Sequence, residues 1–230
     1  MNFHYCCFYD GERFEKIANE SIRPILDTHG KCFETKNIFT REWLEQTPEF
    51  VKNQDKFSRS LRGCGYWRWK PLVIKEVMKN LPENDIVCYF DVADIWSGDY
   101  TSFLKTLFTE SDLFVATPVQ LNEPLKKWCR RDVFEYLEVS DDFSEKFGFE
   151  AGMISFKNCE KSREFVDRWF DLCMDDRGLV EDKETNICGK ENFEGFIDHR
   201  HDQAILSVML LKENYPYLEY NGRYVQGNHF

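Results

Sequence analysis

The chain has 230 residues, of which 42% are hydrophobic and 31% charged, and its formal net charge is −11. This balance is typical of a folded globular domain and excludes a disordered chain. The negative charge would repel a phosphate backbone, so a nucleic-acid-binding protein is not expected.

Strand-like and helical segments alternate along the first half of the chain. The predicted elements are a strand over Phe3–Tyr9, a helix over Gly11–Thr28, a helix that begins at Pro71 and carries apolar residues to Leu81, and a strand over Ile86–Phe90. Proline suits the first turn of a helix, where its missing N–H is not needed. The continuous apolar run of the last strand predicts that both of its faces are covered, as in a parallel sheet.

The second half continues the alternation. Its predicted elements are a helix with the apolar face Phe103–Phe108, strands over Leu113–Ala116 and Met153–Phe156, and helices over Phe165–Cys173 and Ile205–Leu210. Strands that alternate with helices predict an α/β sheet in a three-layer core. Ligands of such sheets bind beyond the carboxyl ends of the strands, so candidate functional residues are sought there.

The cysteine pattern and the apolar runs bear on where the protein works. Nine cysteines are scattered along the chain without a C-x-x-C pair, which favours reduced, mostly buried thiols over disulfides or a zinc module. No basic stretch followed by an apolar one opens the chain, and no run of about 18 apolar residues occurs, so neither a signal peptide nor a membrane span is predicted. We expect one domain over residues 1–230, in the cytoplasm or peripherally at a membrane.

Two carboxylates, Asp91 and Asp94, follow the predicted buried strand directly. Divalent cations such as Mg²⁺ or Mn²⁺ take oxygen ligands and keep open positions for a substrate phosphate. The alternative is turn chemistry, with Asp91 capping a turn and Asp94 solvated.

The segment Gly63–Pro71 reads GCGYWRWKP and combines glycines, aromatic residues and cations. Arg62 and Lys70 lie close to the start of the predicted helix, where backbone N–H groups also point outward, and this combination suits a pyrophosphate. The alternative is an aromatic core segment with the Lys70 stem lying along it.

Two further polar segments flank predicted elements. Before the strand at Met153, Glu150 is followed by the small residues Ala151 and Gly152, which would leave room for a sugar, and Glu150 could act as a general base. The alternative there is a tight turn with an exposed acid. The segment Asp198–Gln203 is too polar for a core, and the alternative to a functional role is that Asp202 caps the following helix. Zinc at its two histidines lacks a further partner.

Taken in order, four segments resemble small nucleotide-sugar glycosyltransferases of the GT-A fold, in the group marked by a G-Y-W-x-W-K-P segment. The matching segments are Gly65–Pro71, Asp85–Asp91, Glu150–Lys157 and His199–Gln203. The resemblance spans about residues 1–211. It implies a Rossmann-like three-layer α/β sandwich with a mostly parallel mixed sheet.

The resemblance also implies a function, the transfer of a sugar from a nucleotide diphosphate-sugar donor to a glycan, lipid or protein acceptor. The donor-binding residues that it implies are Tyr9 and Asp10 near the base and ribose, Lys70 near phosphate or sugar, Asp91 near ribose and metal-bound phosphate, Gly152 beside the transferred sugar, and Gln203 near the reacting centre or acceptor. Arg62 joins them as a diphosphate-binding candidate because of its place near the start of the predicted helix. If the reaction inverts the sugar's configuration, Asp202 and then Glu150 are the candidates for the base that deprotonates the acceptor.

One departure from the family pattern concerns the metal. The second Asp of the D-x-D signature falls at Ala93, and Asp94 comes one residue late, where a regular strand would point it away from Asp91. A Mn²⁺ or Mg²⁺ site would then use Asp91 and Asp94, with His199, His201 or His229 completing it. The alternative is metal-free catalysis in which Arg62 and Lys70 neutralise the diphosphate.

Two competing functions remain open. The first is an inactive relative that binds nucleotide or carbohydrate, which the alanine at position 93 motivates. The second is a metal-dependent nucleotide-sugar hydrolase, which also needs acidic residues after strands.

Overall fold

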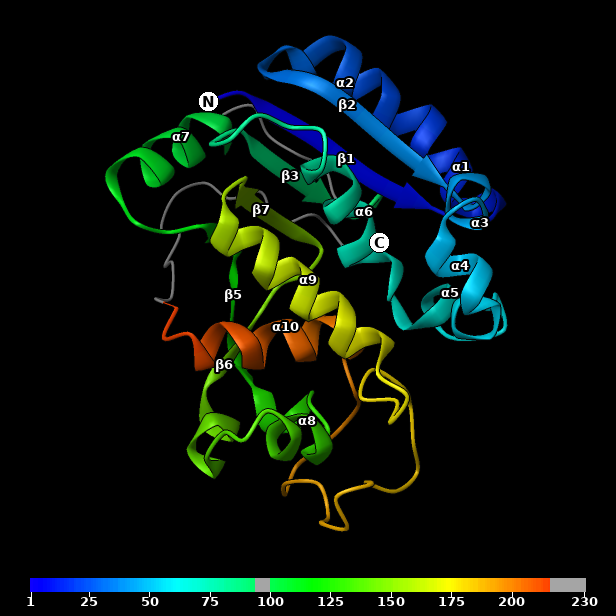
Figure 1. Ribbon diagram of the computed structural model, residues 1–230, viewed down its shortest axis with the longest axis vertical. Helices are drawn as coiled ribbons and strands as arrows, with labels where there is room; N and C mark the ends of the chain where they lie inside the picture. The colour runs from blue at the N-terminus through cyan, green and yellow to red at the C-terminus, as the bar shows by residue number, and fades with distance from the viewer. Residues whose placement is uncertain (94–99, 216–230) are drawn as a thin grey trace.

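The computed structural model describes residues 1–93 and 100–215 (Figure 1). The main sheet consists, in spatial order, of β2 (Phe33–Thr40), β1 (Phe3–Tyr9), β3 (Ile86–Phe90), β7 (Met153–Lys157) and β4 (Val115–Ala116). A second sheet pairs β5 (Val119–Pro124) with β6 (Phe147–Phe149). The helices are α1 (Glu12–Ile17), α2 (Arg23–His29), α3 (Arg41–Glu45), α4 (Pro48–Lys52), α5 (Gly63–Tyr66), α6 (Trp69–Met78), α7 (Tyr100–Glu110), α8 (Arg131–Tyr136), α9 (Glu160–Met174) and α10 (His201–Lys212).

The main sheet is mixed and mostly parallel. β1 runs parallel to both β2 and β3, whereas β7 runs antiparallel to both β3 and β4. Strands β2, β1, β3 and β4 therefore share one direction, and β7 is reversed between two of them. The predicted mostly parallel mixed sheet is confirmed.

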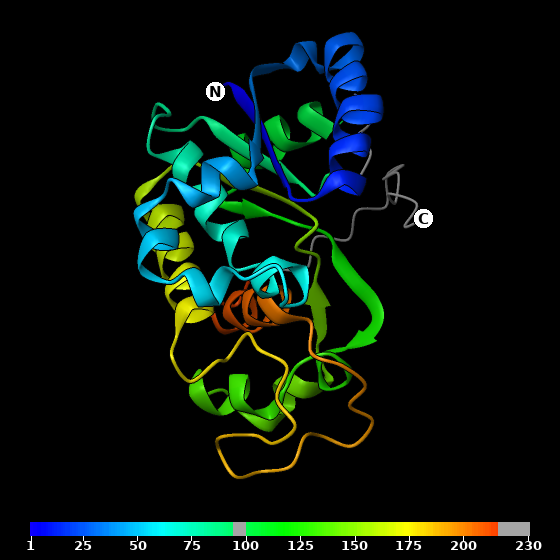
Figure 2. The same cartoon turned by 90° about the vertical axis from the view of Figure 1, so that its right-hand side faces the viewer.

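Helices cover both faces of this sheet, which gives three layers (Figures 1 and 2). Tyr5 and Cys7 of β1 belong to a core that is closed by the helical stretch from α1 to α2 and by α7. Their neighbours Cys6 and Phe8 belong to the opposite core, which α6, α9 and α10 close. Because both faces of the central strands are buried, Ile86–Phe90 is apolar throughout, as predicted.

The predicted helix over Gly11–Thr28 forms as three consecutive pieces. Between α1 and α2 lies a π-helical turn, Ala18–Ile22, and Pro24 follows it in the first turn of α2. Proline cannot donate to the carbonyl four residues earlier, and the wider turn lies where that hydrogen bond would be missing.

The other predicted helices and strands are confirmed within a few residues of their expected ends. The helix expected at Pro71 begins two residues earlier, at Trp69, and the strand expected over Leu113–Ala116 is limited to Val115–Ala116. Strands β2, β5 and β6 and helices α3, α4, α5 and α8 were not predicted.

A long connection without regular structure, residues 175–200, joins α9 to α10 and passes beneath α8 (Figures 1 and 2). It is fastened by buried polar groups. The Arg130 Nη1 donates to the backbone oxygen of Glu181 at 3.0 Å, and the Asp132 carboxylate accepts the backbone N–H groups of Ile187 and Cys188 at 3.1 and 2.8 Å. The connection is therefore held in one path over the lower part of the molecule.

No helix among residues 1–93 and 100–215 has the length and apolar character needed to cross a bilayer. The nine cysteines are free thiols, and the buried ones are Cys6, Cys7, Cys88, Cys129 and Cys173.

Candidate functional site

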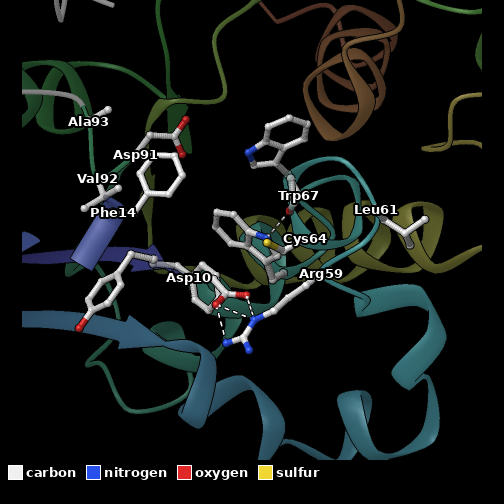
Figure 3. Close-up of a pocket in the computed structure, with 13 residues that line it drawn as sticks. Asp10, Phe14, Arg59, Leu61, Cys64, Trp67, Asp91, Val92 and Ala93 are labelled. Atoms are coloured by element: carbon white, nitrogen blue, oxygen red, sulfur yellow. Dashed lines mark hydrogen bonds and ion pairs between the residues drawn. The ribbon is translucent and has the colours of Figure 1, made fainter. Parts of the chain in front are cut away.

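A cavity of about 440 Å³ opens at the carboxyl ends of β1 and β3 (Figure 3). Because the two strands are parallel neighbours, the residues that follow them, Asp10 and Asp91, emerge at the same edge of the sheet. The residues that line the cavity are Phe8, Tyr9, Asp10, Phe14, Arg59, Leu61, Gly63, Cys64, Trp67, Trp69, Asp91, Val92 and Ala93. Aromatic rings thus form much of the wall, with two carboxylates and one guanidinium among them.

One wall is a short left-handed turn. The five consecutive residues from Gly63 to Trp67 all have positive φ, between 53° and 108°. Non-glycine residues rarely adopt this conformation, which costs about 1–2 kcal/mol each, so surrounding contacts must hold the turn. The Trp69 indole N–H donates to the Gly63 oxygen at 2.9 Å, and the Trp67 ring stacks on His201 at 5.3 Å between centroids. The predicted GCGYW segment therefore forms one wall of the cavity, to which Gly63, Cys64 and Trp67 contribute.

Asp10, predicted near the base and ribose, lies in the cavity wall, and its carboxylate is paired with two arginines. The Arg59 Nε donates to both of its carboxylate oxygens, at 3.0 and 3.1 Å, and Nη2 adds a third bond at 2.8 Å (Figure 3). Arg41 lies 3.8 Å away, and the Asp10 side chain is only 3% exposed. Asp10 therefore fixes Arg59, whose own side chain is 62% exposed, at the cavity. Burial and the nearby Asp10 raise the pKa of the Cys64 thiol to about 11, so this thiol stays protonated.

Lys70 and Asp91, both predicted donor-binding residues, are in contact. The Lys70 Nζ lies 3.3 Å from Asp91 Oδ1 and 3.5 Å from Oδ2. The Tyr89 hydroxyl donates to Asp91 Oδ1 at 2.7 Å, and the Asp91 backbone N–H donates to the Gly152 oxygen at 2.7 Å. The Asp91 carboxylate is thus held from the protein side while about a third of it remains exposed at the cavity.

The same ammonium reaches two further predicted segments. Lys70 Nζ lies 3.4 Å from Asp202 Oδ2 and donates to the backbone oxygen of Ala151 at 3.1 Å. Burial opposes the charge on Lys70, yet the carboxylates of Asp202 and Asp91 outweigh it and raise the pKa of this lysine. Burial, offset in part by Lys70, raises the pKa of Asp202 to about 6.

Asp202 lies behind the cavity instead of in its wall. Its side chain is 4% exposed and is not among the lining residues. The buried indole of Trp169 donates to its backbone oxygen at 3.0 Å, which fixes the start of α10. Glu150 and Gln203, the other residues predicted near the reaction, are half-buried; Gln203 faces a much smaller hollow beside Trp128 and Gly148.

Arg62, predicted as a diphosphate-binding cation, faces another part of the protein. Its Nη1 pairs with Asp198 at 2.7 Å and lies 4.0 Å from Asp182. Among the described residues that line the cavity, the cation is Arg59, which was not predicted from the sequence. Nothing in the sequence favours Arg59 over Arg62, because which of the two arginines reaches the cavity depends on the conformation of the turn at Gly63–Trp67.

The predicted metal ligands are not all described by the structure, and those that are described lie in different surroundings. Asp94 and His229 lie outside the described residues. His199 is buried, with its Nδ1 accepting the Arg130 backbone N–H at 3.3 Å and its Nε2 donating to the Leu179 oxygen at 2.9 Å. Burial, followed by the effect of His201, lowers the pKa of His199 well below its usual value, which keeps the ring neutral with both nitrogens in use.

The residues described do not fit a divalent cation shared by Asp91 and Asp202, because the Lys70 ammonium already occupies the space between them. Within residues 1–93 and 100–215, no group of three or more His, Cys, Asp or Glu is placed to hold a metal ion.

No protein-family model matches this chain, and no curated protein matches it either. Among solved structures it is similar to the apo form of mouse xyloside xylosyltransferase 1, with a TM-score of 0.46 and 10% identity over 94% of this chain and 84% of that one. It is also similar to the galactosyltransferase LgtC in complex with donor and acceptor sugar analogs, with a TM-score of 0.41 and 11% identity over 72% of this chain and 62% of that one.

Proposed function

We propose that this chain is a glycosyltransferase of the GT-A type that binds a nucleotide diphosphate-sugar in the cavity at the carboxyl ends of β1 and β3. One observation carries the proposal. The four segments that resemble this family are far apart in sequence, yet they meet at a single atom. One segment supplies that atom, Lys70 Nζ, and the other three supply its partners, Asp91, the Ala151 oxygen and Asp202.

The cavity has the features that a nucleotide diphosphate needs. Aromatic rings such as Phe14 and Trp67 offer flat apolar surface to a base, and the Arg59 guanidinium offers charged donors to phosphate. Its position beyond the ends of parallel strands is where ligands of α/β sheets bind. The proposed acceptor is a hydroxyl of a glycan, lipid or protein.

In the proposed reaction, the bond between the anomeric carbon and the diphosphate oxygen breaks, and its electron pair leaves with the diphosphate. The acceptor oxygen forms the new bond to that carbon and loses its proton. Stabilising the departing diphosphate is the main requirement. Arg59 lines the cavity, and Lys70 contacts Asp91 in its wall. Glu150 and Asp202 remain the proposed proton acceptors; Glu150 is the more accessible of the two.

Direct binding tests the proposal. We expect one of UDP, GDP, CDP or TDP to raise the unfolding temperature by several degrees at saturation, because a ligand at about 100 times its Kd stabilises a fold by about 2.7 kcal/mol. Phe14 is exposed in the cavity wall, so Phe14→Ala should weaken that binding about tenfold without unfolding the chain. The matched control is Val51→Ala, an exposed apolar residue outside the cavity. Equal affinity in Phe14→Ala and wild type would refute the proposed cavity.

Product analysis then separates the reaction from its alternatives. Transfer of the sugar, or its slow release by water, together with a nucleoside diphosphate is the expected outcome. Release of a nucleoside monophosphate would instead identify a hydrolase of the diphosphate bond. Tight binding without turnover toward a broad acceptor panel would identify an inactive binding protein.

A further inference from the structure

The rings of His201 and Trp67 connect the start of α10 to the wall of the cavity. Trp67 is one of the residues that line this cavity (Figure 3), and its indole stacks on the His201 imidazole with 5.3 Å between centroids and 28° between the ring planes. The Tyr66 ring contacts the same imidazole at 5.0 Å. One wall of the cavity is therefore supported by a residue from the last helix of the described chain.

The His201 ring is itself held in one orientation. The residue is 2% exposed, and its Nδ1–H donates to the Val180 backbone oxygen at 2.8 Å. The His199 ring packs edge-on against it, with 5.4 Å between centroids. A buried ring that is fixed by a hydrogen bond on its edge leaves its face free to support a second ring.

His201 occupies this place in spite of two unfavourable features. Its φ of +48° is a left-handed conformation at the first residue of α10. Its Nε2 is buried without a hydrogen-bond partner among the described residues, and Asp182 Oδ1 lies 3.7 Å away. Strained backbone and unpaired polar atoms persist only where the surrounding structure fixes them, and they gather at functional sites. The ring face, which contacts Trp67, is thus the part of His201 that reaches the cavity wall.

Trp67 depends on such a support. It is half-buried, and it ends the run of positive φ that begins at Gly63, with a φ of 58° of its own. Because local backbone preferences do not favour this conformation, tertiary contacts must hold the indole in the cavity wall. A second contact joins the same two segments, since Asp202 lies 3.4 Å from Lys70 Nζ. The indole is therefore fixed against the start of α10.

We propose that His201 is a positioning residue for the nucleotide: its ring holds the Trp67 indole in the orientation in which the indole stacks on the base. The inference rests on the proposed function for the identity of the ligand. Stacking on an aromatic side chain changes the affinity for a base about five- to a hundredfold. Because the stack involves the base and not the phosphates, its loss should weaken a nucleoside and its diphosphate by the same factor.

Two variants separate the ring of His201 from its hydrogen bond. His201→Phe keeps a flat ring and loses the donor to Val180. His201→Asn keeps a donor and loses the ring, and asparagine tolerates the left-handed conformation. Calorimetry measures the Kd of the nucleoside diphosphate that binds best and of its nucleoside. We expect His201→Phe to stay within about twofold of the wild type and His201→Asn to weaken both ligands about fivefold.

The matched control is Val208→Ala, which removes buried apolar atoms from the same helix at a position outside the cavity wall. It should lower the unfolding temperature and leave both affinities unchanged. Unchanged affinities in His201→Asn, an equal loss in His201→Phe, or a loss confined to the diphosphate would overturn the proposal. If His201→Asn does not fold, the result for His201→Phe decides.

A double-mutant cycle tests whether His201 acts through Trp67. Trp67→Ala should weaken both ligands about tenfold, and adding His201→Asn to it should cause no further loss, because the supported ring is already gone. Additive losses would show that His201 acts by another route and would overturn the proposal. Failure of every nucleotide to bind the wild type would instead refute the proposed function, so the two failures are distinguishable.

Discussion

The two arginines near the cavity, Arg59 and Arg62, show how much a single residue's role depends on the path of the backbone. They are three positions apart, yet Arg59 points into the cavity from Asp10 and Arg62 pairs with Asp198 elsewhere. Their chemistry is identical, so only the fold distinguishes the donor-binding candidate from its neighbour.

This difference makes a matched pair of variants. Arg59→Gln should lower the affinity for the nucleoside diphosphate about tenfold, the effect of losing a charge-assisted hydrogen bond, while the affinity for the nucleoside alone changes little. Arg62→Gln should leave both affinities near the wild-type values. Calorimetric titrations of both ligands against both variants measure this. An equal loss for the nucleoside, or a larger effect of Arg62→Gln, would contradict the assignment.

The buried His199 makes a second prediction, about pH. Burial lowers the pKa of this ring in the folded state, so below a pH of about 6.5 the unfolded chain takes up a proton that the folded chain does not. Stability should therefore be fully present above that pH and fall as the pH drops through it. We expect His199→Gln to lose part of this slope in melting temperatures measured from about pH 8 to about pH 5, whereas the exposed His29→Gln should keep it. Unchanged slopes in both variants would show that His199 does not drive the acid sensitivity.

Among the candidate residues, the sequence located those that follow strands and missed those that depend on loop folding. Asp91 and Asp10 come directly after β3 and β1, and an apolar run followed by an acidic residue can be recognised from the sequence alone. Lys70 and Asp202 were singled out from their polar or cationic segments and from the family resemblance, but their contact with each other was not predicted. That contact joins positions 132 residues apart and depends on α6 and α10 packing over one face of the sheet.

At the scale of elements, the left-handed turn Gly63–Trp67 is the part of the site where conformation is most constrained. A Cβ added at Gly65, where φ is +108°, would lie 2.4 Å from the Lys56 backbone oxygen. Gly189 also has a positive φ, of +73°, but a Cβ there would meet nothing within 4 Å.

The two glycines separate backbone strain from steric clash. Gly189→Ala should cost about 1–2 kcal/mol, the penalty of the left-handed conformation alone. Gly65→Ala should cost clearly more, because a backbone oxygen cannot move aside as a flexible side chain can. Urea unfolding of both variants, compared through their midpoints at equal m-values, measures the difference. Equal costs would mean that the turn is free to shift away from Lys56.

Elements with a continuous apolar face were predictable, whereas the elements at the margins of the fold were not. β2 is an edge strand in which Phe33 is buried and the next three residues are exposed, so neither a full apolar run nor a regular alternation marks it. β6 and α8 have three and six residues, too few for a period to show. The π-helical turn before Pro24 could not be predicted either. A proline in the sequence shows where a helical hydrogen bond is missing, but it does not show which backbone conformation the chain adopts there.

At the scale of the whole molecule, one core connects the main sheet to the part below it. The buried cluster that contains Tyr89 of β3 also contains Phe149 of β6 and Phe134 of α8, with Ile205 of α10 among them. Unfolding either part would expose apolar surface of the other. This continuity supports the prediction of one domain over the chain.

Calorimetry tests that prediction. We expect a single heat-absorption peak whose calorimetric and van't Hoff enthalpies coincide, as for a two-state domain. Two resolved peaks, or a van't Hoff enthalpy well below the calorimetric one, would show that the second sheet and the long connection unfold separately from the main sheet.

The positions of the cysteine thiols allow local unfolding of the protein to be followed without introducing a label site. Cys6, Cys88, Cys129 and Cys173 are fully enclosed and sit respectively in β1, in β3, ahead of α8 and in α9, while Cys188 is exposed in the long connection. Burial raises the pKa of each enclosed thiol, which further slows its reaction with an alkylating reagent until the surrounding structure opens. The labelling rate of Cys188 therefore serves as the reference for an exposed thiol. Mass spectrometry can then follow the order in which Cys6, Cys88, Cys129 and Cys173 are labelled, and this order shows which layer of the protein opens first.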